Sequence, residues 1–196
     1  FVGYNAGGSS TGITGQSNNG VGAFALEDVT SGEHNSAFGK TALANCTTGY
    51  KNTAVGNYAL QSNTTGYDNT AVGYAALINV TTNIENTGVG KGCLSEVTSG
   101  GYNTGLGKDA GNNITTGGFS VNIGAYAKPS AATSSNEITI GYSATGKGNN
   151  TGFISPNGGA VYQGNNSSSW STTSDRRIKK NIVNNTTGLD KINQIT

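Results

Sequence analysis

Side chains able to do acid–base, nucleophilic or metal chemistry are sparse in this sequence, and basic ones gather near its C-terminal end. Four of the eleven basic residues fall within Arg176–Lys180, directly after Ser174 and Asp175. Residue types alone allow two interpretations of this stretch. It is either a solvated basic turn leading into the helix-like segment 187–196, or part of a reactive site.

The other candidate residues favour structural roles. Cys46 and Cys93 are too few for a disulfide framework and lack metal-ligand spacing. Cys93 stands where related segments carry alanine, so we expect a small buried side chain. His34 lies in a turn-like Gly-Glu-His-Asn stretch, and we expect it to be solvated. We predict no metal site, no cofactor and no glycan hydrolase, because no paired-carboxylate arrangement is visible among Glu27, Asp28, Glu33, Glu85 and Glu96.

Composition excludes several classes of partner. The formal net charge is +1 and only 11% of the residues are charged, so we expect no nucleic-acid partner. No apolar run approaches 18 residues, so we expect no membrane insertion. The low apolar content, 33% with 32 glycines, is typical of disordered chains, but the regular spacing described next argues against disorder. The chain contains no Met, and we expect it to be a piece of a longer polypeptide.

A repeat of 17 residues dominates the sequence. A glycine recurs at this interval from Gly22 to Gly141, each time preceded by an apolar residue such as Val55. Three positions after the glycine the chain carries alanine or Cys93, followed in five copies by leucine. Asparagine opens six successive units, at Asn18, Asn35, Asn52, Asn69, Asn86 and Asn103.

This period predicts an all-β fold, a parallel β-solenoid (β-roll). Gly, Asn and Thr are poor helix formers and the apolar residues show no helical spacing. Short strands bounded by turn residues, stacked coil on coil, would give a rise of about 4.8 Å per coil. The glycines provide positive φ or close backbone approach. The asparagines are expected in left-handed turn conformation and stacked as an amide ladder.

The repeated Asn-Thr-Ala-Val-Gly predicts self-association. Ala and Val are neighbours, so in a strand they face opposite sides. We place Val55 in the thin interior, where Val55→Asp would prevent folding. The opposite face is then also apolar or small, and a symmetric copy of the chain is its simplest cover.

The repeats themselves resemble known families. Units such as NTAVGYAALINVTT look like the repeats of phage tail-fibre shafts, and are similar, with a different period, to the head repeats of trimeric autotransporter adhesins. Both families form parallel homotrimers. The resemblance covers Gly20 to about Gly141 and implies a homotrimer.

A second resemblance concerns the C-terminal stretch. The string Ser-Asp-x-Arg-Ile-Lys-x-Asn-Ile, starting at Ser174, resembles the start of the self-cleaving intramolecular-chaperone domain of phage endosialidases and tail fibres. The resemblance implies that Ser174 is the nucleophile, Lys179 its base and Asp175 an accessory group, with cleavage between Thr173 and Ser174. A lysine acts as a base only when desolvation or neighbouring cations lower its pKa. The family's domain is much longer than the segment present here, so we expect no cleavage in this 196-residue chain.

These observations divide the chain into four parts. Residues 1–19 form a cap or a preceding partial coil, 20–145 the solenoid, 146–173 a loop-rich neck with a strand near Gly159–Gln163, and 174–196 the truncated, helix-like start of a chaperone domain.

The expected function is that of a structural and adhesive segment of an extracellular, trimeric phage tail fibre. Its partners are then other copies of itself, other virion or fibre proteins and a host surface glycan or protein receptor. Any enzymatic activity is limited to one self-cleavage. The alternative is the shaft or head of an autotransporter-like adhesin on a bacterial cell surface.

Overall fold

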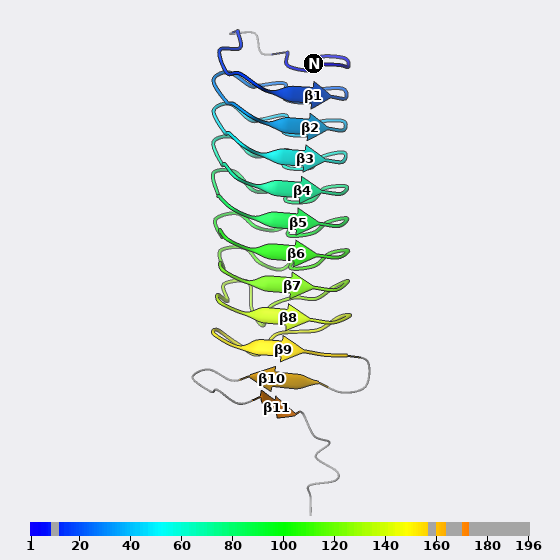
Figure 1. Ribbon diagram of the computed structural model, residues 1–196, viewed down its shortest axis with the longest axis vertical. Coiled ribbons are helices and arrows are strands. Elements are labelled where there is room, and N and C mark those ends of the chain that lie inside the picture. The colour runs from blue at the N-terminus through cyan, green and yellow to red at the C-terminus, as the bar shows by residue number, and fades with distance from the viewer. Residues whose placement is uncertain (9–11, 157–159, 164–169, 173–196) are drawn as a thin grey trace, which may run out of the picture.

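The protein is a straight β-solenoid rod (Figure 1). The computed structural model describes residues 1–8, 12–156, 160–163 and 170–172. A single sheet contains eleven strands in chain order. Each strand has three residues: β1 Asn19–Val21, β2 Ser36–Phe38, β3 Thr53–Val55, β4 Thr70–Val72, β5 Thr87–Val89, β6 Thr104–Leu106, β7 Val121–Ile123, β8 Ile138–Ile140, β9 Gly152–Ile154, β10 Val161–Gln163 and β11 Trp170–Thr172.

The strands stack in parallel with matched register, as the repeat predicts. Ala54 of β3 lies beside Ala71 of β4, and Val55 beside Val72. The same offset of 17 positions relates each pair of neighbours from β1 to β8. The predicted solenoid fold and its coil length are therefore confirmed. No helix occurs within the described residues, and the segment expected to begin a helix lies outside them.

The two ends of the rod depart from this regularity. Val2 forms a parallel bridge with Val21, so the first residues lie on the first coil. At the other end Ile138 pairs with Gly152, which shortens the last coil to 14 residues. Strand β10, which falls inside the predicted strand, and β11 then continue the sheet in antiparallel fashion. The change of strand direction at β10 ends the parallel repeat and covers the edge of β9.

The interior holds one thin layer of small and branched side chains. In strands β1 to β9 the middle residue is buried, as Ala54 and Ala71 are, and points inward. Opposite these small residues lies a column of fully buried leucines: Leu26, Leu43, Leu60, Leu77 and Leu94. Pairing a large residue with a small one fills a narrow coil without voids.

Tight turns in each coil use left-handed backbone conformation. Within one coil Lys51, Tyr58 and Leu60 have φ of 54°, 64° and 49°. Such values are uncommon for residues with a Cβ. The backbone bonds to adjacent coils hold them in place. For example, the Tyr58 amide donates to the Lys40 carbonyl and the Leu60 amide to the Ala76 carbonyl, at 3.0 and 3.1 Å.

The glycine that follows each of strands β1 to β8 is required for two reasons, its positive φ and the lack of space for a Cβ. Gly73 has a φ of 134°, a region that L residues rarely adopt. A Cβ on Gly73 would lie 2.5 Å from the carbonyl oxygen of Gly90 in the next coil. The expected positive φ and close backbone approach are both confirmed.

The opening asparagines form the expected amide ladder inside the rod. The Asn52 backbone and side-chain amides both donate to Asn35 Oδ1, at 3.0 and 3.1 Å, and Asn52 Nδ2 also donates to the Gly66 carbonyl at 2.7 Å. One detail of the prediction is wrong, because the left-handed conformation belongs to the preceding residue, here Lys51. An asparagine with ordinary φ can point inward and bond across coils.

Candidate functional site

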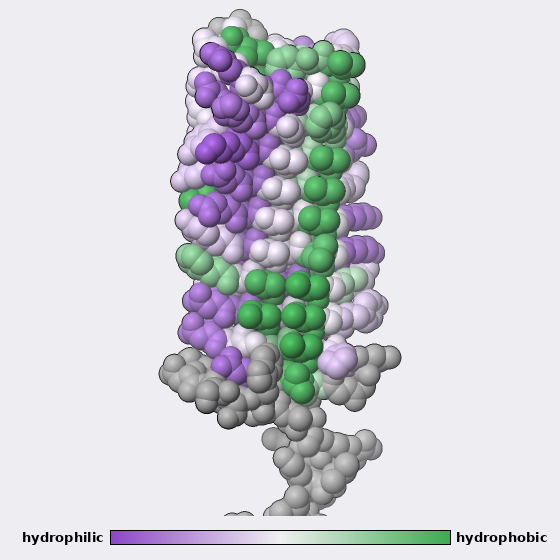
Figure 2. All heavy atoms as spheres, in the orientation of Figure 1, coloured by the Kyte–Doolittle hydropathy of each residue, from purple (hydrophilic) through white to green (hydrophobic). Residues whose placement is uncertain are grey.

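The most prominent surface feature is an apolar stripe along the rod. It consists of the third residue of strands β1 to β8: Val21, Phe38, Val55, Val72, Val89, Leu106, Ile123 and Ile140. Figure 2 shows it as an unbroken green column. Val55 is 38% exposed and Leu106 is 48% exposed.

The prediction that Val55 lies in the interior is therefore wrong. Ala54 occupies the inner face and Val55 the outer one, because adjacent strand residues face opposite sides. Leu60 and its stacked equivalents fill the coil, which leaves room only for a small residue at the strand centre. The predicted second apolar face does exist, and it is the valine face.

In strands β1 to β8 the first residue points to the same side as the stripe, because alternate strand residues share a face. These residues are polar in the first coils and threonine in the middle ones, as in Thr53 and Thr70. In β7 and β8 they become Val121 and Ile138, and the latter is 43% exposed. The apolar surface therefore widens toward the C-terminal coils, as Figure 2 shows.

The stripe can bind only through shape and apolar burial. Its side chains carry no charge and no hydrogen-bonding group, and strand stacking repeats them every ~4.8 Å. Monomeric soluble proteins rarely leave such a contiguous apolar surface uncovered. A flat, regular column of branched side chains suits another surface of the same period.

The residues implied in self-cleavage lie outside the described part of the chain. Thr173, Ser174, Asp175 and Lys179 fall within residues 173–196, so their arrangement stays a prediction. Across residues 1–8, 12–156, 160–163 and 170–172, no group of three or more His, Cys, Asp or Glu side chains could hold a metal ion.

Both cysteines are buried in the core, as expected for Cys93. Burial raises the pKa of the Cys46 thiol to about 11 and that of Cys93 to about 12. Their sulfur atoms lie within 3.6 and 3.4 Å of the Gly49 and Ala110 carbonyl oxygens. The thiolate is the reactive form, so neither residue is suited to nucleophilic or redox chemistry near neutral pH. His34 is exposed in a turn, as predicted.

A polar cluster lies inside the coils that contain β7 and β8, and it is not among the sequence predictions. Glu137 is fully buried and accepts hydrogen bonds from the amides of Ser130 and Gly148, at 3.1 and 2.8 Å. Asn122 and Thr139, also fully buried, have side-chain atoms without partners. The indication was available: the asparagine column changes to Ser120 and then Glu137. The cluster ends the apolar core before the last coil.

Comparison with known proteins finds no counterpart: no protein-family model, curated protein or solved structure matches the chain. In the part of the chain that the structure describes, no helix has the length and apolar character needed to cross a bilayer.

Proposed function

We propose that this chain is a shaft segment of an extracellular homotrimeric fibre, of the kind found in phage tails, in which the apolar stripes of three parallel chains meet along a common axis. The observation that carries the proposal is the continuous column of partly exposed apolar side chains from β1 to β8.

The width of the stripe favours three chains over two. From β1 to β6 the column is one side chain wide, and it is covered from both flanks when two neighbours meet it at a threefold axis. Covering a residue such as Val55, which is already partly buried, contributes roughly 0.5–1 kcal/mol, a fraction of the value for complete burial. Repetition along eight coils makes the sum large.

The polarity gradient along the same face favours parallel chains. Beside the stripe the sheet carries Asn19 and Ser36 at one end, and Val121 and Ile138 at the other. Parallel association places the wide apolar ends together. Antiparallel association would instead press Asn19 against Ile138 and bury polar groups without partners, which costs free energy.

The test is the mass of the chain in solution. The 196-residue chain should sediment as a trimer at micromolar concentration. We expect Val55→Asp to remain a folded β protein but to sediment as a monomer, because the charge would be buried at the axis. Thr48→Asp is the matched control, since Thr48 is an exposed residue in a turn of the preceding coil. A monomeric wild-type chain, or a trimeric Val55→Asp variant, would contradict the proposal.

We also propose a single self-cleavage next to Ser174 when the complete downstream domain is present. The support is the family-like string alone, with Lys179 five positions after Ser174. A serine needs an adjacent base to act as a nucleophile near neutral pH. Denaturing gels of the full-length protein should show two bands for the wild type and one for Ser174→Ala and for Lys179→Ala.

A single band for the wild type and for both variants would refute both assignments. If Ser174→Ala blocks cleavage but Lys179→Ala does not, Ser174 is the nucleophile and another group is the base.

The sequence downstream of this chain distinguishes the proposed fibre from the alternative, a bacterial surface adhesin. A chaperone domain would indicate the fibre, and a membrane anchor the adhesin.

A further inference from the structure

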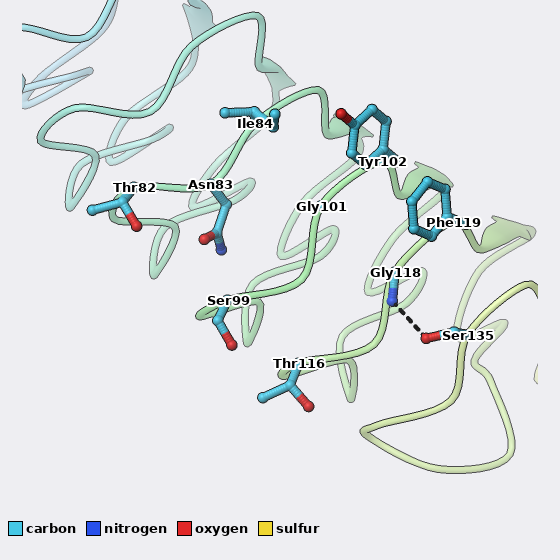
Figure 3. Close-up of a pocket in the computed structure, with 10 residues that line it drawn as sticks. All are labelled: Thr82, Asn83, Ile84, Ser99, Gly101, Tyr102, Thr116, Gly118, Phe119 and Ser135. Atoms are coloured by element: carbon cyan, nitrogen blue, oxygen red, sulfur yellow. Dashed lines mark hydrogen bonds between the residues drawn. The ribbon is translucent and has the colours of Figure 1, made fainter.

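A hollow of about 450 Å³ opens on the surface beside the strands, across four successive coils (Figure 3). Its floor is backbone, at Gly101 and Gly118, and Ile84 and Ser135 close its two ends. Three coil spacings give it a length of ~14 Å along the rod. It is therefore elongated and follows the rod axis.

The hollow exists because one column of side chains is interrupted. At the repeat position of Gly101 and Gly118, earlier coils carry Tyr50, Tyr67 and Ile84. Tyr50 and Tyr67 stack with ring centroids 4.6 Å apart and cover the backbone there. Two successive glycines remove that cover.

In these two coils the aromatic residue stands one position later in the repeat than Tyr50 and Tyr67 do, and it lines one side of the hollow. Tyr102 and Phe119 follow the two floor glycines and stack with centroids 4.7 Å apart and an interplanar angle of 5°. They are 42% and 59% exposed. At the same repeat position earlier coils carry the charged or polar residues His34, Lys51, Asp68 and Glu85.

The opposite rim is lined by hydroxyl groups. Thr82, Ser99 and Thr116 occupy one repeat position in three successive coils, and all are exposed. Asn83 adds an amide near one end. No residue that lines the hollow carries a charge. Hydroxyl and amide groups both donate and accept hydrogen bonds, so this rim matches a ligand rich in hydroxyls.

We propose that this groove binds a neutral oligosaccharide, with sugar rings against Tyr102 and Phe119 and sugar hydroxyls bonded to the threonine–serine rim. The negative face of an aromatic ring attracts the polarised C–H groups of a pyranose. A few polar groups beside an apolar wall are the usual composition of a ligand site. An anionic glycan would find no cation in the lining. The floor carbonyls already accept hydrogen bonds, that of Gly101 from the Phe119 amide at 3.1 Å and that of Gly118 from the Asn136 amide at 3.0 Å, so they are engaged before an extended peptide could pair with them.

This inference gives the proposed fibre's attachment role a ligand class, and it rests on that role. Its variants differ from those that test trimer formation. Val55→Asp should lower the mass of the assembly in solution to that of a monomer and leave the groove of each chain intact. Variants of the groove should bind the oligosaccharide more weakly and remain trimers. Failure of one proposal is thereby distinguishable from failure of the other.

The decisive variant is Gly101→Tyr, which fills the groove with the residue that the rod itself carries at Tyr50 and Tyr67. A Cβ on Gly101 would lie 3.2 Å from the Ile84 carbonyl oxygen, a tight contact that a small shift relieves. Gly118 is unsuitable, because its Cβ would lie 2.8 Å from the Gly101 carbonyl oxygen. Phe119→Ala removes part of the wall without adding volume. Tyr50→Ala is the matched control, since it removes an exposed, stacked ring outside the groove.

Binding is measured with the full chain against neutral hexose oligosaccharides of several linkages, sialylated and uronate-containing oligosaccharides of equal length, and an unrelated extended peptide. We expect binding to at least one neutral oligosaccharide, weakened at least tenfold by Gly101→Tyr and by Phe119→Ala and unchanged by Tyr50→Ala. Thermal unfolding verifies that each variant is folded, and if Gly101→Tyr does not fold, Phe119→Ala decides. No binding to any neutral oligosaccharide, preference for the charged oligosaccharides or the peptide, or unchanged binding by the folded groove variants would overturn the proposal.

Discussion

Asn63 shows how one residue can depart from the repeat at a cost in stability. It lies in a core column that is otherwise apolar or weakly polar, between Cys46 and Val80. Its side chain is fully buried, and neither Oδ1 nor Nδ2 has a hydrogen-bond partner. We expect Asn63→Val to raise the free energy of unfolding by about 1–3 kcal/mol, the cost of a buried unpaired polar group.

Chemical denaturation of the two proteins measures this difference. Asn52→Val is the matched control and should destabilise the chain, because Asn52 makes its ladder bonds on both sides. Equal effects of the two substitutions would mean that Asn63 is satisfied by a group outside the chain, such as water.

The buried thiols predict a loss of stability at high pH. In the folded chain their pKa values are about 11 and about 12, raised by burial from 9.0. A raised folded pKa means that stability is complete below the unfolded value and is lost as pH rises through the folded one. The free energy of unfolding should therefore fall between about pH 9 and pH 12.

Cys93→Ala should make this fall shallower, since alanine occupies the equivalent position in other coils. A thiol reagent at pH 8 should react with the native chain slowly and with the unfolded chain fast. Rapid modification of both cysteines in the native chain would contradict their burial.

At the scale of the coil, glycines divide into those the backbone requires and those it tolerates. Gly73 combines a φ of 134° with a potential Cβ contact of 2.5 Å to a carbonyl oxygen. Gly88 is at a strand centre where the two preceding coils carry Ala54 and Ala71, and its Cβ would meet the Leu77 side chain at 3.2 Å. We expect Gly73→Ala to cost more than about 3 kcal/mol, and Gly88→Ala to change stability by less than about 1 kcal/mol.

Thermal unfolding of the pair checks this contrast under identical conditions. The two substitutions add the same methyl group one coil apart, so unfolded-state effects largely cancel. Similar melting temperatures would show that the close approach at Gly73 can relax.

At the scale of the whole rod, one coil should be removable. Deletion of residues 70–86 joins Asn69 to Thr87, which reproduces the Asn-Thr junction of the intact chain. Each coil contacts only its neighbours, so the remaining coils keep their register. We expect a folded rod that is shorter by ~4.8 Å, detectable by small-angle scattering.

Deletion of residues 70–78 serves as the control. It removes about half a coil and brings outward-facing residues to inward positions, so we expect it not to fold. If both deletions fold equally well, the period does not determine the stacking.

The sequence by itself determined the period and therefore the architecture. Strict recurrence of Gly22, Gly39 and their equivalents leaves room for little except equal coils stacked in register, because each glycine must approach the next coil closely. The amide ladder followed from the same reasoning. The interruption of the tyrosine column at Gly101 and Gly118 was also visible, although its meaning as a groove was not.

Only the tertiary structure decided which side of each strand faces inward. Ala54 and Val55 are neighbours and both are apolar, so alternation alone cannot choose between them. The choice follows from volume: the leucine column occupies the interior, and the coil has space for alanine but not for valine at the strand centre. Because Ala54 faces inward, Val55 lies on the surface, where it and its equivalents form the apolar stripe. The buried Glu137 likewise depended on contacts from residues on either side along the chain, Ser130 and Gly148, which no local pattern specifies.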